Sequence, residues 1–266
     1  MKNKNRFLGA LAAFLCVLSA PVFAGAGKEK PADSPEPVTL MVAAAASLEN
    51  AFTGELIPRF RAKYPWISIE GVYDSSGRLQ VQIEQGLQAD VFMSAAERQM
   101  DALAGKGLVA KDTVRPLLQN KLVLIKPAGT VTAVTGFQNI ALAAIIALGD
   151  PASVPAGQYA KEALVNLGVW DAVQGKLSLG NNVTEVLAWV AEGSAEAGVV
   201  YATDAASTKK VTIIEELPDG LLSGKVIYPA GMIASSAHPE EAALFIDFLE
   251  SEEGLAVFRG YGFSAH

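Results

Sequence analysis

Short apolar runs alternate with amphipathic runs along most of the chain. The apolar runs have the length and composition of buried strands and predict strands at Val38–Ala45, Ile67–Tyr73, Val91–Ser94, Lys121–Lys126, Ile145–Leu148, Ala197–Tyr201, Val211–Glu215 and Lys225–Ala234. Between them, apolar residues recur at the spacing of one helix face, which predicts helices at Leu48–Tyr64, Gly77–Gln85, Glu97–Ala104, Ala156–Asn166, Val173–Leu177, Val183–Glu192 and Pro239–Phe258. Because strands separated by helices form βαβ units, we expect an α/β fold with mostly parallel sheets flanked by helices.

So many strands are more natural in two lobes than in one small sheet. The segments Leu117–Lys121 and Gly224–Pro229 are plausible crossing strands. We therefore expect a first lobe of residues 38–118 plus 226–266 and a second lobe of residues 119–225, with a ligand cleft between them. A chain that crosses in this way suits hinge closure on a ligand.

The N-terminus has the features of a secretory signal peptide. Three positive charges lie within residues 1–6, an apolar run follows from Phe7 to Ala20, and small residues precede an expected cut after Ala24. The apolar run is short for a bilayer span, so a transmembrane helix is disfavoured. Residues 25–37 are charged and proline-rich and are expected to form a disordered leader. We therefore expect the protein to be exported.

The chain's one cysteine, Cys16, lies inside the signal peptide. A lipid-attachment cysteine is the alternative, but Leu15 before it is bulky where such sites need a small residue. The mature chain then has no disulfide and no thiol nucleophile.

Charge excludes several classes of partner. Removing residues 1–24 takes away three positive and no negative charges, which moves the formal net charge from −7 to −10. Such a chain is a poor partner for nucleic acid or for an anionic membrane surface. Any anion site must therefore work through local dipoles.

Ser47 stands between the first predicted strand and the first predicted helix. After it, apolar residues recur at spacings of four: Leu48, Phe52, Leu56 and Phe60. We expect Ser47 to cap this helix, with its hydroxyl facing the end of the sheet. A helix N-terminus at the carboxyl end of a strand favours anions, so this junction is a candidate anion site.

Similar junctions recur along the chain. Ser76 is expected to cap the helix that follows it, and Pro155 is expected at a helix start that leaves the amide of Ala156 free. Asn182 is a candidate cap, and Tyr201 ends a strand with a hydroxyl that can donate. Taken singly, each is more often an ordinary cap or a packed side chain than a ligand contact.

Taken together, these segments resemble a known family. The matching segments occur in order over residues 38–263: Ala44-Ala45-Ala46-Ser47-Leu48, Ser75-Ser76-Gly77 with Gln82-Ile83, Ala89-Asp90-Val91-Phe92-Met93-Ser94-Ala95, Gly149-Asp150-Pro151 with Val154-Pro155-Ala156-Gly157, Gly198-Val199-Val200-Tyr201 with Asp204-Ala205, and Tyr261-Gly262-Phe263. On these residues the chain resembles the periplasmic molybdate-binding proteins of bacterial ABC importers. The resemblance implies a two-lobed periplasmic binding protein fold of type II.

The resemblance also implies the ligand, the partners and the site. The ligand would be molybdate or tungstate, bound as an oxyanion without a cofactor or a metal-cation ligand, and the partners would be a membrane permease and its ATPase, with the binding protein a monomer. The implied ligand-binding residues are Ser47, Ser76, Ala156, Val183 and Tyr201. Two neighbours depart from the family's pattern, Arg78 and Asn182. We expect Arg78 to lie on a solvated helix face. The alternative is that its positive charge makes the local electrostatic potential more favourable for anions.

Molybdate and tungstate carry no proton at neutral pH, so a matching site should offer donors only. Asp74 and Asp150 are near the motifs, and their orientation is open at this point. Sulfate also lacks a proton and is excluded only by its size. Another oxyanion or an organic acid therefore stays an alternative ligand.

A secreted hydrolase is the competing class of protein. No Gly-x-Ser-x-Gly elbow occurs, and neither His238 nor His266 lies near Ser47 in pattern, as a catalytic triad would need. Metal-binding spacings are absent from the sequence. We therefore expect no catalytic residues and a binding protein rather than an enzyme.

Overall fold

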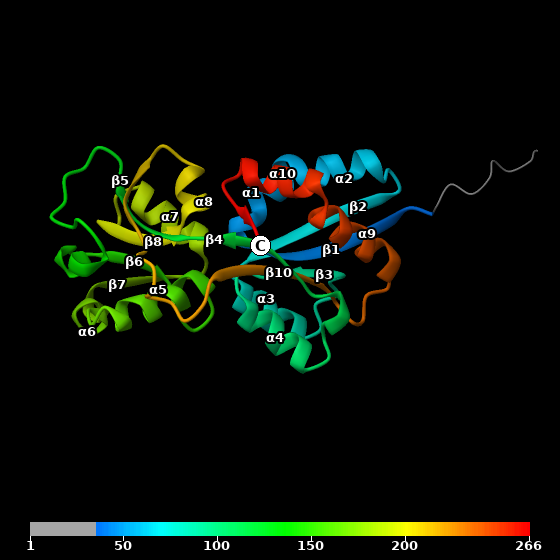
Figure 1. Ribbon diagram of the computed structural model, residues 1–266, viewed down its shortest axis with the longest axis horizontal. Coiled ribbons are helices and arrows are strands. Elements are labelled where there is room, and N and C mark those ends of the chain that lie inside the picture. Colours follow the sequence, from blue (N-terminus) through cyan, green and yellow to red (C-terminus); the bar gives the residue numbers. More distant parts are fainter. Residues whose placement is uncertain (1–35) are drawn as a thin grey trace, which may run out of the picture. The chain divides into compact units, whose positions relative to one another are not determined.

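Two mixed β-sheets, each flanked by helices, carry the fold (Figure 1). The structure is a computed structural model and describes residues 36–266. The predicted signal peptide, Cys16 and all but the last two residues of the predicted leader 25–37 lie outside the described residues. No helix in the described part is both long and apolar enough to cross a bilayer.

The first sheet joins strands from both ends of the described chain. Its strands, in spatial order, are β11 (Ser264–Ala265), β4 (Arg115–Asn120), β10 (Val226–Met232), β3 (Val91–Met93), β1 (Val38–Ala45) and β2 (Ile67–Asp74). Helices cover both of its faces: α1 (Glu49–Ala51), α2 (Ile57–Lys63), α9 (Pro239–Glu250) and α10 (Glu252–Gly260) lie on one side, and α3 (Ser76–Glu84) and α4 (Glu97–Gly105) on the other (Figure 1).

The second sheet is formed by the middle of the chain. Its spatial order is β7 (Leu177–Gly180), β6 (Ile146–Gly149), β8 (Ala197–Tyr201), β5 (Leu122–Pro127) and β9 (Val211–Glu216). Its helices are α5 (Pro155–Asn166), α6 (Trp170–Val173), α7 (Val183–Ala191) and α8 (Ala202–Ala206). Short 3₁₀ helices cover Ala46–Leu48, Lys111–Thr113, Phe137–Leu142 and Gln174–Lys176.

The sheets are mixed rather than mostly parallel, which corrects the prediction for strand direction. The pairs β1–β2, β1–β3, β6–β7 and β6–β8 are parallel. Strands β4, β5, β9, β10 and β11 pair antiparallel with their neighbours. Antiparallel strands need no crossover helix, and the two passages between the sheets, Lys121 and residues 217–225, contain none.

The first helical segment is less regular than the sequence predicts. Its apolar residues Leu48, Phe52, Leu56 and Phe60 are fully buried, as the spacing predicts. However, the turn Phe52–Leu56 is a π-helix between α1 and α2. Pro58 has no N–H to donate to the preceding turn, and its ring crowds the carbonyl there, so the helix widens at this point.

Two further predicted elements differ at their boundaries. The predicted helix Pro239–Phe258 is two helices, because Ser251 breaks it and caps α10 by accepting a hydrogen bond from Gly254 N at 3.2 Å. The predicted helix Val173–Leu177 is displaced, and Leu177 begins strand β7. Short strands and caps carry little periodic signal, so the sequence pattern locates them poorly.

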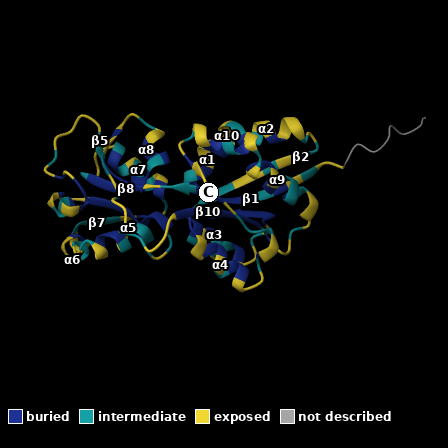
Figure 2. Ribbon diagram, viewed as in Figure 1, coloured by how far each residue is buried: buried dark blue, intermediate teal, exposed yellow. Residues whose placement is uncertain are grey.

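The core is divided by the first sheet into two layers. Alternate residues of β1 face opposite sides, so Val42 and Ala44 join the cluster with Phe52, whereas Ala43 joins a second cluster under α3 and α4. Figure 2 shows the buried residues concentrated in the strands, with the exposed residues on the outward helix faces. The strand ends are thereby held rigidly, and these ends carry the candidate site.

Candidate functional site

A small cavity lies where strands of both sheets end. It is lined by Ala45, Ala46, Ser47, Ser75, Ser76, Ala95, Val154, Pro155, Ala156, Val183 and Tyr201. All five residues that the sequence predicts for the site are among them. Ligands of α/β proteins bind beyond the carboxyl ends of strands, and this cavity meets that rule for β1, β2, β6, β7 and β8.

The two predicted serines reach the cavity, but neither caps a helix. Ser47 lies inside the 3₁₀ helix Ala46–Leu48, and its Oγ is 3.0 Å from the hydroxyl oxygen of Tyr228. Ser76 is the first residue of α3, and its Oγ accepts a 2.9 Å hydrogen bond from Ala95 N. The predicted capping role is therefore wrong, because both hydroxyls bond to other elements of the fold instead of their own helix.

The second sheet contributes helix starts with unused amides. Pro155 is the first residue of α5, as predicted, and Gln158 N donates to Val154 O as the helix begins, so the amide of Ala156 precedes the helical ladder. Val183 is the first residue of α7. Asn182 caps that helix as predicted, with its side chain accepting from Glu185 N at 3.0 Å.

A glycine holds α5 close to the sheet. A Cβ added at Gly157 would lie 1.9 Å from Gly149 O on β6. Any side chain here would collide with backbone that cannot move aside. Gly157 thus sets the position of the neighbouring amide of Ala156.

Two hydroxyls that line the cavity are buried without a hydrogen-bond partner, those of Tyr201 and Ser75. A buried polar group without a partner costs about 1–3 kcal/mol, so this arrangement indicates that a ligand supplies the acceptors. Burial raises the pKa of the Tyr201 hydroxyl well above its ordinary value, which keeps it a donor. Ser75 was not predicted as a site residue, although it stands in the Ser75-Ser76-Gly77 motif; its position directly before α3 was the available signal.

Among residues 36–266, no charged side chain lines the cavity. Asp74 is held beside it by Ser75 N, which donates to Oδ1 at 2.7 Å, and Asp150 accepts from Ala152 N at 2.9 Å. Asp204 is buried nearby and accepts from Tyr201 N at 3.1 Å. Burial raises the pKa of Asp204 to about 7. The side chains that line the cavity therefore provide hydroxyl donors and no carboxylate.

Hydrogen bonds join elements of the two sheets around the cavity. They link Gly77 N to Ser153 O at 2.9 Å, Arg78 Nη2 to Asn181 Oδ1 at 2.6 Å, Asn182 Nδ2 to Asp74 Oδ1 at 3.4 Å, and Gln99 Nε2 to Gln158 Oε1 at 3.1 Å. The Arg78 side chain is about half exposed, as expected for a helix surface. Its guanidinium nevertheless links elements of the two sheets through Asn181. The prediction of a solvated helix face therefore describes its exposure but not this contact.

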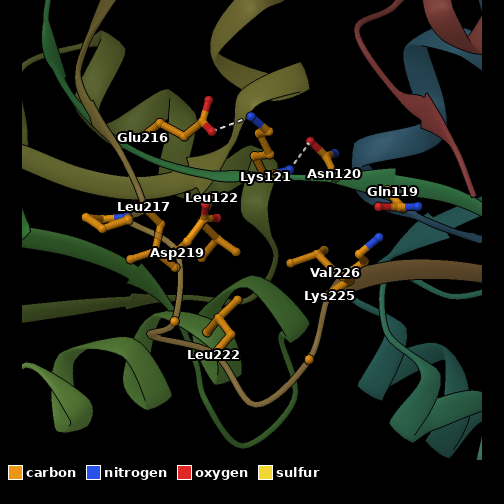
Figure 3. A pocket seen from close by; sticks show the side chains of 13 residues that line it. Gln119, Asn120, Lys121, Leu122, Glu216, Leu217, Asp219, Leu222, Lys225 and Val226 are labelled. Carbon is orange, nitrogen blue, oxygen red and sulfur yellow. Dashed lines mark hydrogen bonds and ion pairs between the residues drawn. The ribbon is translucent and has the colours of Figure 1, made fainter.

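A larger hollow lies elsewhere, beside the two passages between the sheets (Figure 3). Its lining includes the ion pair of Lys121 with Glu216, together with Asp219 and Lys225. None of the five predicted site residues lines it. Of the two histidines, His238 precedes α9 and His266 lies beside Gln119, so neither reaches the cavity.

Comparison with known proteins identifies the family to which the chain belongs. A family model described as "bacterial extracellular solute-binding protein" matches residues 40–264. The chain belongs to this family. The solute-binding proteins of the family are binding proteins rather than enzymes. The predicted α/β fold class, with two sheets flanked by helices, is confirmed apart from the direction of several strands.

Individual solute-binding proteins extend the comparison. The chain is 40% identical to a putative ABC transporter substrate-binding lipoprotein of Bacillus subtilis, over 99% of both chains. It is 36% identical to the molybdate-binding protein ModA of Haemophilus influenzae, over 84% of this chain and 89% of that protein. The solved substrate-binding domain of a putative molybdenum ABC transporter from Clostridium difficile is 36% identical, with a TM-score of 0.65 over 85% of this chain and 98% of that one.

Proposed function

We propose that this solute-binding protein captures molybdate or tungstate in the cavity and delivers it to the permease and ATPase of an ABC importer. The observation that carries the proposal is the pair of buried hydroxyls without partners, on Ser75 and Tyr201, in a cavity without a charged side chain. The Haemophilus relative's name supports the choice of anion. The anion is the one small molecule the protein needs, with no further cofactor and no metal-cation ligand.

Each proposed ligand residue offers a donor to a tetrahedral dianion. Ser47, Ser76 and Tyr201 offer hydroxyls, while Ala156 and Val183 offer amides at the starts of α5 and α7. The unpartnered hydroxyl of Ser75 adds a further donor. Hydrogen bonds to an ion are stronger than neutral ones, and a helix N-terminus adds partial positive charge. A dianion can therefore be held without Arg or Lys, even in a protein of negative net charge.

Donor-only chemistry explains the selection of a proton-free anion. Hydrogen phosphate would bring a proton that needs an acceptor, and among the described residues no carboxylate lines the cavity, because Asp74 and Asp150 lie outside its lining. Sulfate shares the chemistry of molybdate and differs in size. We therefore propose that cavity size selects molybdate and tungstate over sulfate.

The cavity lies between the proposed lobes, residues 38–118 with 226–266 and residues 119–225. We propose that the protein is a monomer that opens and closes on hinges at Lys121 and residues 217–225. The hydrogen bonds that join the two sheets around the cavity would then form on closure. Export through a signal peptide cut after Ala24 would place the protein in the periplasm.

Titration calorimetry on residues 25–266 tests the proposed ligand. Molybdate and tungstate are expected to bind one per protein, with sulfate much weaker and phosphate silent. Molybdate at a hundred times its Kd should stabilise the fold by about 2.7 kcal/mol. Heat from phosphate or an amino acid, with none from molybdate, would overturn the proposal.

A further inference from the structure

The Ser47 hydroxyl belongs to a chain of hydrogen bonds that runs through both crossing strands. Ser47 Oγ lies 3.0 Å from the hydroxyl oxygen of Tyr228 on β10. Asn120, at the end of β4, places its Nδ2 3.3 Å from the same Tyr228 oxygen and 2.9 Å from Thr203 Oγ1. The cavity is thus connected, through Tyr228, to the strands that lead from one sheet to the other.

The direction of this chain is set at Asn120. Its Oδ1 accepts a 2.9 Å hydrogen bond from Lys121 N, which determines which end of the amide is oxygen (Figure 3). The Nδ2 that faces Tyr228 can only donate. The Tyr228 oxygen is therefore an acceptor toward Asn120.

The Tyr228 proton then has to point to Ser47. Tyr228 is fully buried, and burial raises the pKa of its hydroxyl well above the ordinary value, so the proton is retained. Among the described residues, Ser47 Oγ is the acceptor that hydrogen-bond geometry gives this proton. If Ser47 donated instead, the Tyr228 proton would be buried without a partner, which is unfavourable. Ser47 is left with its own proton free toward the cavity that it lines.

Ser76 is arranged in the same way by a different donor. Its Oγ accepts from Ala95 N at 2.9 Å, so its proton is also free for the cavity. Hydrogen bonds in such a series polarise one another and strengthen the terminal donor. Both serine hydroxyls thus accept a hydrogen bond from the protein and keep their own proton for a ligand. The donor is the Tyr228 side chain for Ser47 and the Ala95 backbone for Ser76.

We propose that Tyr228 is a positioning residue, which orients the Ser47 hydroxyl as a donor to the bound oxyanion and so contributes to the selection of anions without a proton. This inference rests on the proposed function. Tyr228 does not itself line the cavity, and it acts only through Ser47. Its contribution should therefore vanish when Ser47 is absent.

A double-mutant cycle tests this dependence by titration calorimetry with sodium molybdate. Tyr228→Phe keeps the ring and removes the hydroxyl, and it should weaken binding about tenfold, as expected for one oriented bond to an ion. In the Ser47→Ala background the same change should alter Kd by less than about twofold. In the Ser76→Ala background it should keep its full effect, because Ser76 takes its donor from Ala95.

Tyr73→Phe is the matched control. It also removes a buried tyrosine hydroxyl, but this hydroxyl has no hydrogen-bond partner and Tyr73 does not line the cavity. It should leave Kd unchanged. An equal loss from Tyr228→Phe in all three backgrounds would overturn the inference, because the hydroxyl would then act on the fold and not on Ser47. If wild type itself binds no molybdate, the proposed function fails instead.

Melting curves without ligand show whether Tyr228→Phe is folded. Should that variant not fold, Asn120→Leu removes the first donor of the chain while leaving Tyr228 in place. It should weaken molybdate binding in wild type and not in Ser47→Ala. Equal weakening in both backgrounds would overturn the inference as well.

Discussion

The guanidinium of Arg78, on α3, donates a 2.6 Å hydrogen bond to Oδ1 of Asn181, which lies 103 residues further along the chain beside α7. The two residues belong to elements of different sheets, and each is next but one to a residue that lines the cavity. If the two lobes open to release the ligand, this bond has to break. It therefore bears on how long the ligand stays bound.

Replacing Arg78 by Ala should speed ligand release. Exposed polar pairs contribute up to about 1 kcal/mol, so we expect molybdate affinity to fall about threefold, mainly through the dissociation rate. Stopped-flow fluorescence would measure that rate. Arg61→Ala, at an exposed position in the last turn of α2, is the control. An unchanged dissociation rate in Arg78→Ala would show that the bond does not hold the closed state.

Removing the Tyr201 hydroxyl should act in opposite directions on stability and on binding. Tyr201→Phe deletes a buried group without a partner, so the ligand-free protein should be as stable as wild type or slightly more so. Molybdate binding should weaken about tenfold, because a donor to the dianion is lost. Melting curves with and without molybdate measure both. A less stable ligand-free variant would mean that the hydroxyl has a protein partner.

Gly157→Ala should disrupt the approach of α5 to β6. The new Cβ would meet Gly149 O at 1.9 Å, and such overpacking costs about 1–3 kcal/mol or more. We expect a lower melting temperature and loss of molybdate binding, because the amide of Ala156 moves with the helix. Gly105→Ala, on α4, meets nothing within 4 Å and should be neutral or stabilising. Wild-type binding by Gly157→Ala would exclude the proposed role of the α5 amide.

Asp204 should make the fold less stable as pH rises. Burial raises its pKa in the folded protein to about 7, above its ordinary value of 3.8. Well below pH 3.8 the group is protonated in both states and costs nothing, and between the two pKa values the unfolded state is ionised while the folded state is still protonated. From pH 5 to pH 8 this should remove on the order of 3 kcal/mol of folding stability. Urea unfolding of Asp204→Asn should lack this loss, so its advantage over wild type should grow with pH. An advantage that is constant or shrinks would contradict it.

The mature N-terminus can be read directly. If the signal peptide is cut after Ala24, mass spectrometry of the exported protein should show a chain that begins at Gly25, and Cys16→Ser should change neither its mass nor its location. The Bacillus relative is named a lipoprotein. If this chain instead carried a lipid on Cys16, the modified N-terminus would be lost in Cys16→Ser, and the predicted cut after Ala24 would be wrong.

Much of the fold and of the cavity lining could be predicted from sequence. Helix and strand types follow from local apolar spacing, because burying one face of an element depends on its own residues. The apolar face from Leu48 to Phe60, the helix start at Pro155 and the cap at Asn182 are all of this kind. The five residues drawn from the family resemblance all line the cavity, while their contact with molybdate stays a proposal.

The tertiary structure decided where each hydroxyl points and how the strands run. Ser47 bonds to Tyr228, 181 residues away, and not to its own helix. Ser75 lies buried without a partner, and β10 enters the first sheet antiparallel to β3. Local sequence patterns reflect interactions between near neighbours, and these patterns were enough to predict the type of most longer elements but not their breaks at Phe52–Leu56 and Ser251. Only packing brings together the distant segments that supply the hydrogen-bond donor to Ser47. The same packing determines which hydroxyls remain free for a ligand.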